Sequence, residues 1–98
     1  MMRADYESRA DTIEIALESV DRLDYGEPVA GGRVIVHFRD DRPAMIDVIG
    51  TQHGFEETLR RAAERYGLDA ETLVAVARAA LAAPDRPVRL DVGARVAA

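Results

Sequence analysis

The spacing of apolar residues changes once along this chain, near residue 50, and that change limits the possible folds more than any other feature. Before it, apolar and polar residues alternate, as at Ile13, Ile15 and Leu17, which is typical of strands with one buried face. After it, Phe55 and Leu59 begin a run at helical spacing. The order predicts an α+β domain in which an antiparallel sheet precedes the helices.

Three alternating segments in the first half predict a three-stranded antiparallel meander. They are residues 11–18, 33–39 and 43–50, and each is rich in residues that favour strands. The connection over 19–32 is mostly polar and contains glycine and proline, which leaves room for a short extended piece around 27–30.

The length of the turn between the last two of these strands decides which side chains share a face. A two-residue loop at 40–41 would place Asp47 with the apolar residues of the preceding strand, whereas a three-residue loop at 40–42 places it opposite them. A shift of one residue moves every side chain to the other face, so burial favours the three-residue loop. The predicted core face is Ile13, Ile15, Leu17, Val34, Val36, Phe38, Ile46 and Val48, and the reverse face carries Thr12, Glu14, Ala16, Ile35, His37, Met45, Asp47 and Ile49.

The second half predicts a helical hairpin over 54–66 and 69–83, followed by a short last strand over 87–92. Gly67 stands where a helix C-cap belongs, and Asp69 is placed to cap the next helix. With 98 residues and neither an internal repeat nor a linker, the chain is expected to form a single domain.

Composition excludes several kinds of chemistry. The chain has no cysteine and no lysine, which excludes disulfides, thiolate catalysis and Schiff-base chemistry. A net charge of −5 argues against broad binding to nucleic acid or anionic lipid. No apolar run approaches the roughly 20 residues that span a bilayer, and the start lacks the features of a secretory signal. We therefore expect a cytoplasmic protein with no membrane partner.

The candidate catalytic and metal-binding residues are few. His37 and His53 are the only histidines, and with Asp47 they could supply a two-histidine, one-carboxylate metal site. No close-spaced metal motif accompanies them, so neither a metal nor another cofactor is predicted. Asp47 interrupts an apolar strand and would suit a general base if burial raised its pKa. A small enzyme centred on Asp47 stays an alternative, but no catalytic residue is assigned because no nucleophile motif or phosphate-binding loop is present.

Residues 59–81 have the outline of a helix-turn-helix, which makes a DNA-binding regulator a second alternative. The second helix would read the DNA, yet it carries Glu71 in its first turn and Arg78 as its only basic group. Acidic groups at that end oppose phosphate binding. A hairpin that packs against the sheet is the better interpretation.

The reverse face of the sheet is the candidate partner surface. Ile35, Met45 and Ile49 form an apolar strip there, next to His37, and helices on the other face cannot cover it. Exposed strips of this kind usually mark an interface unless the chain's own loop or last strand covers them. A homodimer, packed by its faces or paired by its edges, would bury the strip. The leading hypothesis is a non-catalytic protein-interaction module that self-associates.

The first half also resembles the domain-of-unknown-function family numbered 2283, a group of small bacterial proteins. That family opens with Tyr-Asp-x-x-Ala-Asp-x-Leu-Tyr-Ile, and residues 6–15 read Tyr-Glu-Ser-Arg-Ala-Asp-Thr-Ile-Glu-Ile without a gap. Residues 32–37 and 45–49 are similar to its next two strands. The resemblance covers about residues 5–50, and the helical half lies outside it.

Three departures separate this chain from that family. Glu14 replaces the usual aromatic residue, Asp47 stands in for glutamate, and the turn at 40–42 lacks glycine and is one residue shorter. The resemblance implies a β-meander without an assigned activity. Relatives of this kind are often encoded beside candidate toxins, which implies an antitoxin-like or accessory role and carries over no functional residue.

Overall fold

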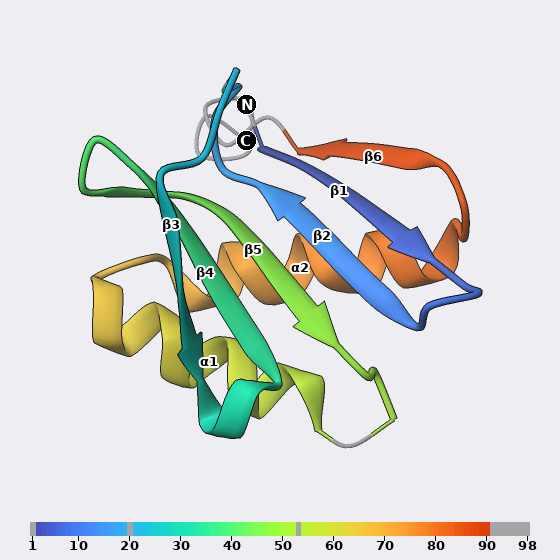
Figure 1. Cartoon of the computed structure of the whole chain (residues 1–98). Helices are drawn as coiled ribbons and strands as arrows, with labels where there is room; N and C mark the ends of the chain where they lie inside the picture. The colour runs from blue at the N-terminus through green and yellow to red at the C-terminus, as the bar shows by residue number, and fades with distance from the viewer. Residues whose placement is uncertain (1, 20, 53, 91–98) are drawn as a thin grey trace.

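Six antiparallel strands form one sheet, and both helices lie against the same face of it (Figure 1). This computed structural model describes residues 2–19, 21–52 and 54–90. It confirms an α+β fold with an antiparallel sheet and two helices. None of the helices in these ranges is long and apolar enough to cross a membrane. The elements are β1 (Met2–Glu7), β2 (Thr12–Ala16), β3 (Tyr25–Val29), the 3-10 turn η1 (Ala30–Gly32), β4 (Val34–Arg39), β5 (Arg42–Ile49), α1 (Phe55–Tyr66), α2 (Ala70–Ala82) and β6 (Pro87–Leu90).

The predicted three-stranded meander is wrong in strand number and in neighbours. The strands lie in the order β3-β4-β5-β2-β1-β6, so β2 pairs with β5 rather than with β4. Strands β3, β4 and β5 form consecutive hairpins. A long connection separates β2 from β3 in the chain, and β2 lies on the far side of these hairpins, next to β5. This is a Greek-key arrangement.

Two of the six strands were not predicted as strands. β1 alternates inward Met2, Ala4 and Tyr6 with outward charged residues, and it pairs with β2 on one side and β6 on the other. β3 was predicted only as part of a connection with room for a short extended piece around 27–30, which overlaps the observed strand. It forms at the edge of the sheet, where proline is tolerated because the outer side of the strand needs no partner.

The β4–β5 hairpin has a two-residue loop, so the predicted three-residue loop is wrong. Asp40 and Asp41 both have positive φ, 52° and 60°, as a type I′ turn requires. The pairing then shifts by one residue between His37 and Phe38, which leaves Ala44 as the extra residue of a β-bulge. The bulge restores the parity that the short loop would have reversed, and Ile46 therefore lies on the core face as predicted.

The core lies between the sheet and the helices. α1 packs against β3, β4 and β5, while α2 packs against β1, β2 and β6 (Figure 1). Every predicted core-face residue is buried except Leu17, which is partly buried. Removing this apolar surface from water is the main force that holds the layers together. The helices contribute Leu59, Ala62, Ala63, Leu73, Val74, Val76, Ala77 and Ala80 to the core.

The helix boundaries agree with the prediction to within a residue. Gly67 adopts the left-handed conformation at φ 68°, and its N–H bonds the carbonyl of Ala63. The Asp69 side chain accepts hydrogen bonds from the N–H groups of Glu71 and Thr72, so it caps α2 as predicted. The last strand is observed over Pro87–Leu90; the rest of the predicted range, 91–92, lies outside the described residues.

Candidate interaction surface on the open face of the sheet

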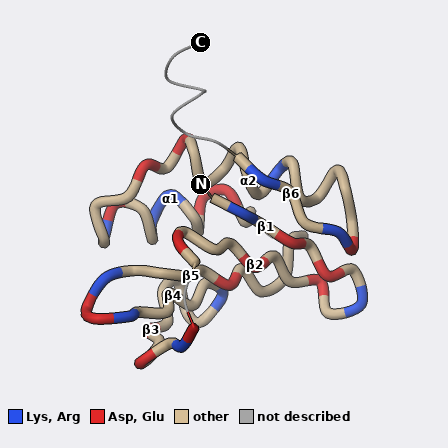
Figure 2. Tube along the Cα trace, turned by 90° about the horizontal axis from the view of Figure 1, so that it is seen from above, with Lys and Arg blue, Asp and Glu red and all other residues tan. Residues whose placement is uncertain are grey.

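The face of the sheet opposite the helices is uncovered by any element in the described part of the chain. Figure 2 shows both helices on one side of the sheet, and Figure 1 looks directly onto the other side. We call that side the open face; it is the predicted reverse face enlarged by the outer strands. Its residues are Arg3, Asp5, Glu7, Thr12, Glu14, Ala16, Gly26, Pro28, Ile35, His37, Met45, Asp47, Ile49, Pro87 and Arg89.

The predicted interface residues all lie on the open face, where Asp47 stands between Met45 and Ile49 on β5 and opposite Ile35. Ile49 is 44% exposed, while Ile35 and Met45 are partly exposed. Met45 lies directly opposite Ala16 of β2 in the strand pairing. The structure thus places the predicted residues on one face, where they offer apolar surface to a partner.

His37 and Asp47 form a hydrogen-bonded pair among these apolar residues. Their Nε2 and Oδ2 atoms are 2.8 Å apart, and the side chains are 24% and 26% exposed. Gly26 lies opposite His37 on β3, and a Cβ atom there would come within 3.0 Å of the His37 Nδ1 atom. The glycine therefore leaves the imidazole room to lie along the sheet. His53, the other histidine of the predicted site, lies outside the described residues.

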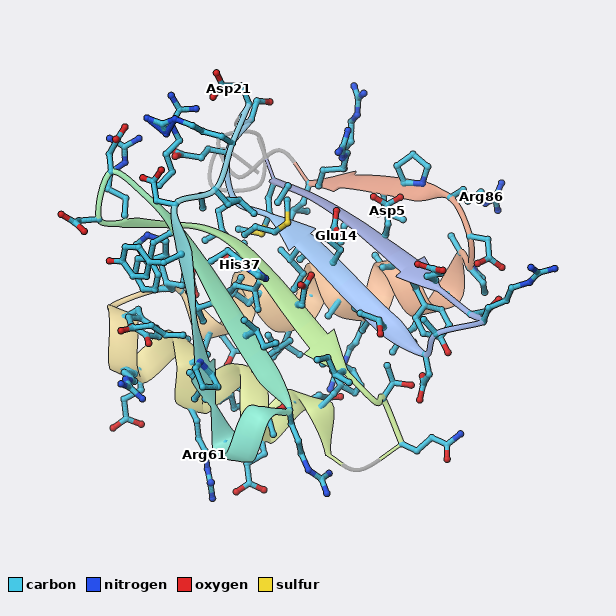
Figure 3. The ribbon with its side chains drawn as sticks, viewed as in Figure 1. Asp5, Glu14, Asp21, His37, Arg61 and Arg86 are labelled. Atoms are coloured by element: carbon cyan, nitrogen blue, oxygen red, sulfur yellow. The ribbon has the colours of Figure 1, made fainter. Side chains whose placement is uncertain are left out.

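Carboxylates form a row across three neighbouring strands, which we call the acidic row: Asp5, Glu14 and Asp47. Asp5 pairs with Glu14, and Glu14 pairs with Asp47. Burial raises the pKa of Glu14, the negative charges of Asp47 and Asp5 raise it further, and Arg3 and His37 act in the opposite direction. Figure 3 labels Asp5 and Glu14 on β1 and β2, in the same view onto the open face. In the described ranges, no three His, Cys, Asp or Glu side chains are arranged to hold a metal ion.

A second row, one step along the strands, carries the arginines and the histidine of the open face. Arg3 pairs with Arg89 of β6 on one side and with Ala16 on the other, and the same line continues through Met45 to His37. We call Arg3, Arg89 and His37 the basic row. Arg3 and Asp5 are 50% and 39% exposed, and they approach each other only to 4.0 Å. Both side chains therefore stay accessible to solvent.

The surface of the two helices is poorly suited to binding DNA. Arg78, the only basic residue of α2, donates to both carboxylate oxygens of Glu56 on α1, at 2.9 and 2.5 Å. Arg60 donates to Glu71 in the first turn of α2. Both arginines are thus paired with carboxylates across the two helices, which disfavours phosphate binding by this hairpin.

A polar cluster that the sequence did not predict lies at the end of the sheet where three connections meet. Asp11 accepts hydrogen bonds from the Tyr6 hydroxyl at 2.9 Å and from the Thr51 hydroxyl and N–H at 2.5 and 3.1 Å. Asp85 accepts from the N–H and hydroxyl of Ser8, at 2.9 and 2.7 Å, and these bonds lower its pKa. The bonds join the β1–β2 turn to the connections before α1 and before β6, so the cluster is structural.

The charged rows were missed because β1 was not predicted. Without it, Arg3 and Asp5 had no position in the sheet, and the predicted meander placed the strand of Glu14 beside residues 33–39 rather than beside Asp47. The signal was the alternation over residues 2–7, in which Ala4 is the small central member of the inward set. Comparison with protein-family models, curated proteins and solved structures finds no match for this chain. The open face is therefore interpreted from its own residues.

Proposed function

We propose that this protein is a non-catalytic interaction module that self-associates through the open face of its sheet. The observation that carries the proposal is the exposed Ile49 together with the partly exposed Ile35 and Met45, on a face that no described element covers. Hiding apolar surface from water stabilises association by roughly 25 cal/mol for each Å². A mixture of apolar and charged residues is also typical of partner surfaces.

Face packing is favoured over edge pairing. The edge strands β3 and β6 are five and four residues long, and each contains a proline, Pro28 or Pro87. Short edge strands with proline are poor templates for a further strand. Two sheets packed face to face lie about 10 Å apart, which lets side chains from both open faces interdigitate.

The His37–Asp47 pair fits an interface better than an active site. A histidine–carboxylate pair becomes catalytic when it activates a nucleophile in an enclosed site. This pair lies on the open surface of a sheet, where both side chains are about one-quarter exposed. An antitoxin-like or accessory role, implied by the resemblance of residues 5–50, would be compatible with a self-associating module of this kind.

Light scattering coupled to size-exclusion chromatography, over a range of concentrations, tests the proposal. The wild-type protein should show the mass of a dimer at high concentration and dissociate on dilution. Ile49→Glu and Ile35→Glu should each weaken association at least about tenfold, since a buried unpaired charge costs more than 1.4 kcal/mol.

Leu23→Glu is the matched control, because Leu23 is 37% exposed and lies outside the open face. It should leave the dimer unchanged. A wild-type protein that stays monomeric at millimolar concentration contradicts the proposal. Equal weakening by the control variant also contradicts it.

A further inference from the structure

We infer that the second copy binds with its two-fold axis across the strands, so that Asp5 of each copy faces Arg3 of the other. The inference rests on the proposed self-association and adds the orientation of the partner. It follows from the order of charges on the open face. Two copies of this face bring opposite charges together when the two-fold axis runs across the strands, but not when it runs along them.

The two rows are parallel and adjacent. Residues two apart on a strand are about 7 Å apart, and neighbouring strands lie about 4.8 Å apart. Asp5 and Arg3 stand two apart on β1, so the acidic row and the basic row cross the sheet side by side. The acidic row uses β1, β2 and β5, and the basic row uses β6, β1 and β4.

A two-fold axis that lies between the open faces and runs across the strands exchanges these rows. Each strand then meets the same strand of the second copy, and Asp5 faces Arg3 of that copy. The reciprocal contact forms by symmetry, because a two-fold interface uses the same patch on both partners. Packed sheets cross at about 30°, and the long side chain of arginine can span the offset of a few ångströms that this introduces.

An axis that runs along the strands leaves the rows unexchanged. The acidic row would then face the acidic row of the second copy, and Arg3 would approach the basic row of that copy. Like charges brought together at an interface suppress that arrangement. Charge complementarity therefore selects the orientation across the strands.

The carboxylates of the open face differ in how close they lie to a partner group of the same copy. Asp47 is bonded to His37 of its own copy at 2.8 Å. Asp5 is 4.0 Å from the nearest nitrogen of Arg3, and Glu14 lies between two other carboxylates in the strand pairing. In the inferred orientation, Arg3 of the second copy approaches Asp5 and the neighbouring Glu14, where it adds a second cation to the long 4.0 Å contact that Asp5 makes with Arg3 of its own copy.

Charge reversal on β1 tests the orientation. Arg3→Asp places two acidic side chains opposite each other, and Asp5→Arg places two arginines opposite each other. Each single variant should self-associate at least about tenfold more weakly than the wild type. An equimolar mixture of the two variants should form a heterodimer, since each acidic position then faces an arginine. The double variant R3D/D5R should recover self-association to within about threefold of the wild type.

The controls separate this inference from the proposed function. Thermal unfolding followed by circular dichroism confirms that each variant is folded, which is expected because both positions are at least 39% exposed. Arg3→Gln, which removes a charge without reversing it, should weaken association less than Arg3→Asp. If the wild type is monomeric, the proposed function itself fails.

A different result overturns only the orientation. If Ile49→Glu breaks the dimer while R3D and D5R each self-associate like the wild type, the face is used but the rows do not meet. Single variants that weaken association without recovery in the mixture or the double variant also overturn it.

Discussion

The two faces of this sheet are built from the same strands, yet they differ in what alternate residues place on them. In β5, Ala44, Ile46 and Val48 are no more than 1% exposed beneath the helices. Their neighbours Met45 and Asp47 point to the open face, where apolar and charged groups mix. On the covered face, Thr72 of α2 is the only buried polar side chain in the described part of the chain.

This difference shows how one strand can carry two independent sets of side chains. Side chains on a strand alternate between faces, so each set can change without moving the other. The side chains of the sheet that face the helices are apolar, because burying a charge without a partner would cost free energy. The open face keeps apolar groups that contribute little to folding of the single chain, and we propose that they contribute to association.

The largest expected effect separates the two faces on a single strand. Ile46→Ala removes a fully buried side chain and should lower the free energy of unfolding by about 2–5 kcal/mol. Ile49→Ala, three residues away and 44% exposed, should cost less than about 1 kcal/mol. Urea denaturation measures both changes in the free energy of unfolding, at a protein concentration low enough that the chain does not self-associate. Equal losses at the two positions would mean that the faces do not differ in this way.

A smaller loss of stability is expected where Asp11 joins the β1–β2 turn to the connection before α1. Asp11→Ala removes the acceptor for Tyr6 and Thr51 and places alanine at φ 49°. It should lower the free energy of unfolding by about 1–3 kcal/mol. Asp11→Asn is the matched control, because asparagine keeps an oxygen acceptor and tolerates this backbone conformation. It should retain more stability than the alanine variant, and the opposite order would argue against these bonds.

The helical layer offers a third test. Asp69→Ala removes the cap of α2 and should cost about 1 kcal/mol in thermal or urea unfolding. Asp69→Ser, which keeps an oxygen at the cap, should recover much of that loss. Neither change should alter the dissociation constant of the dimer, because α2 lies on the covered face. A shift in that constant would place α2 in the interface.

The smallest effect concerns the acidic row and depends on pH. The raised pKa of Glu14 means that folding favours its protonated form, so its negative charge lowers stability at neutral pH. This cost disappears as the pH falls below 4.5, the ordinary pKa of the group. Glu14→Gln should therefore be slightly more stable than the wild type at pH 7, and the difference should vanish near pH 4. If the variant is less stable than the wild type at pH 7, the charge of Glu14 stabilises the fold and this interpretation is wrong.

The sequence predicted the α+β class, four of the six strands and both helices because period two and helical spacing are local signals. Alternation located β2, β4 and β5, and the caps at Gly67 and Asp69 located the helix ends. Strand order depends on which segments meet in space, and alternation does not specify it. β3 was predicted only as a possible short extended piece, because Gly26 and Pro28 indicate a turn unless the strand is known to lie at an edge.

The candidate surface was predicted in part for a related reason. Face parity placed Ile35, Met45 and Ile49 together correctly even though the loop length behind that parity was wrong. The error cancelled because the bulge at Ala44 supplied the residue that the turn lacked. The acidic and basic rows could not be predicted, since a row across a sheet exists only once the neighbouring strands are known.

The prolines at the two sheet edges have a consequence for how far assembly can grow. Strand addition at an edge leaves a new edge, so it can continue into a fibre. A two-fold contact between faces leaves nothing further to occupy, since each copy has used its single open face. With Pro28 and Pro87 making both edges poor templates, association of the proposed kind would end at two copies. Its extent would then be set by concentration alone and not by the number of chains already joined.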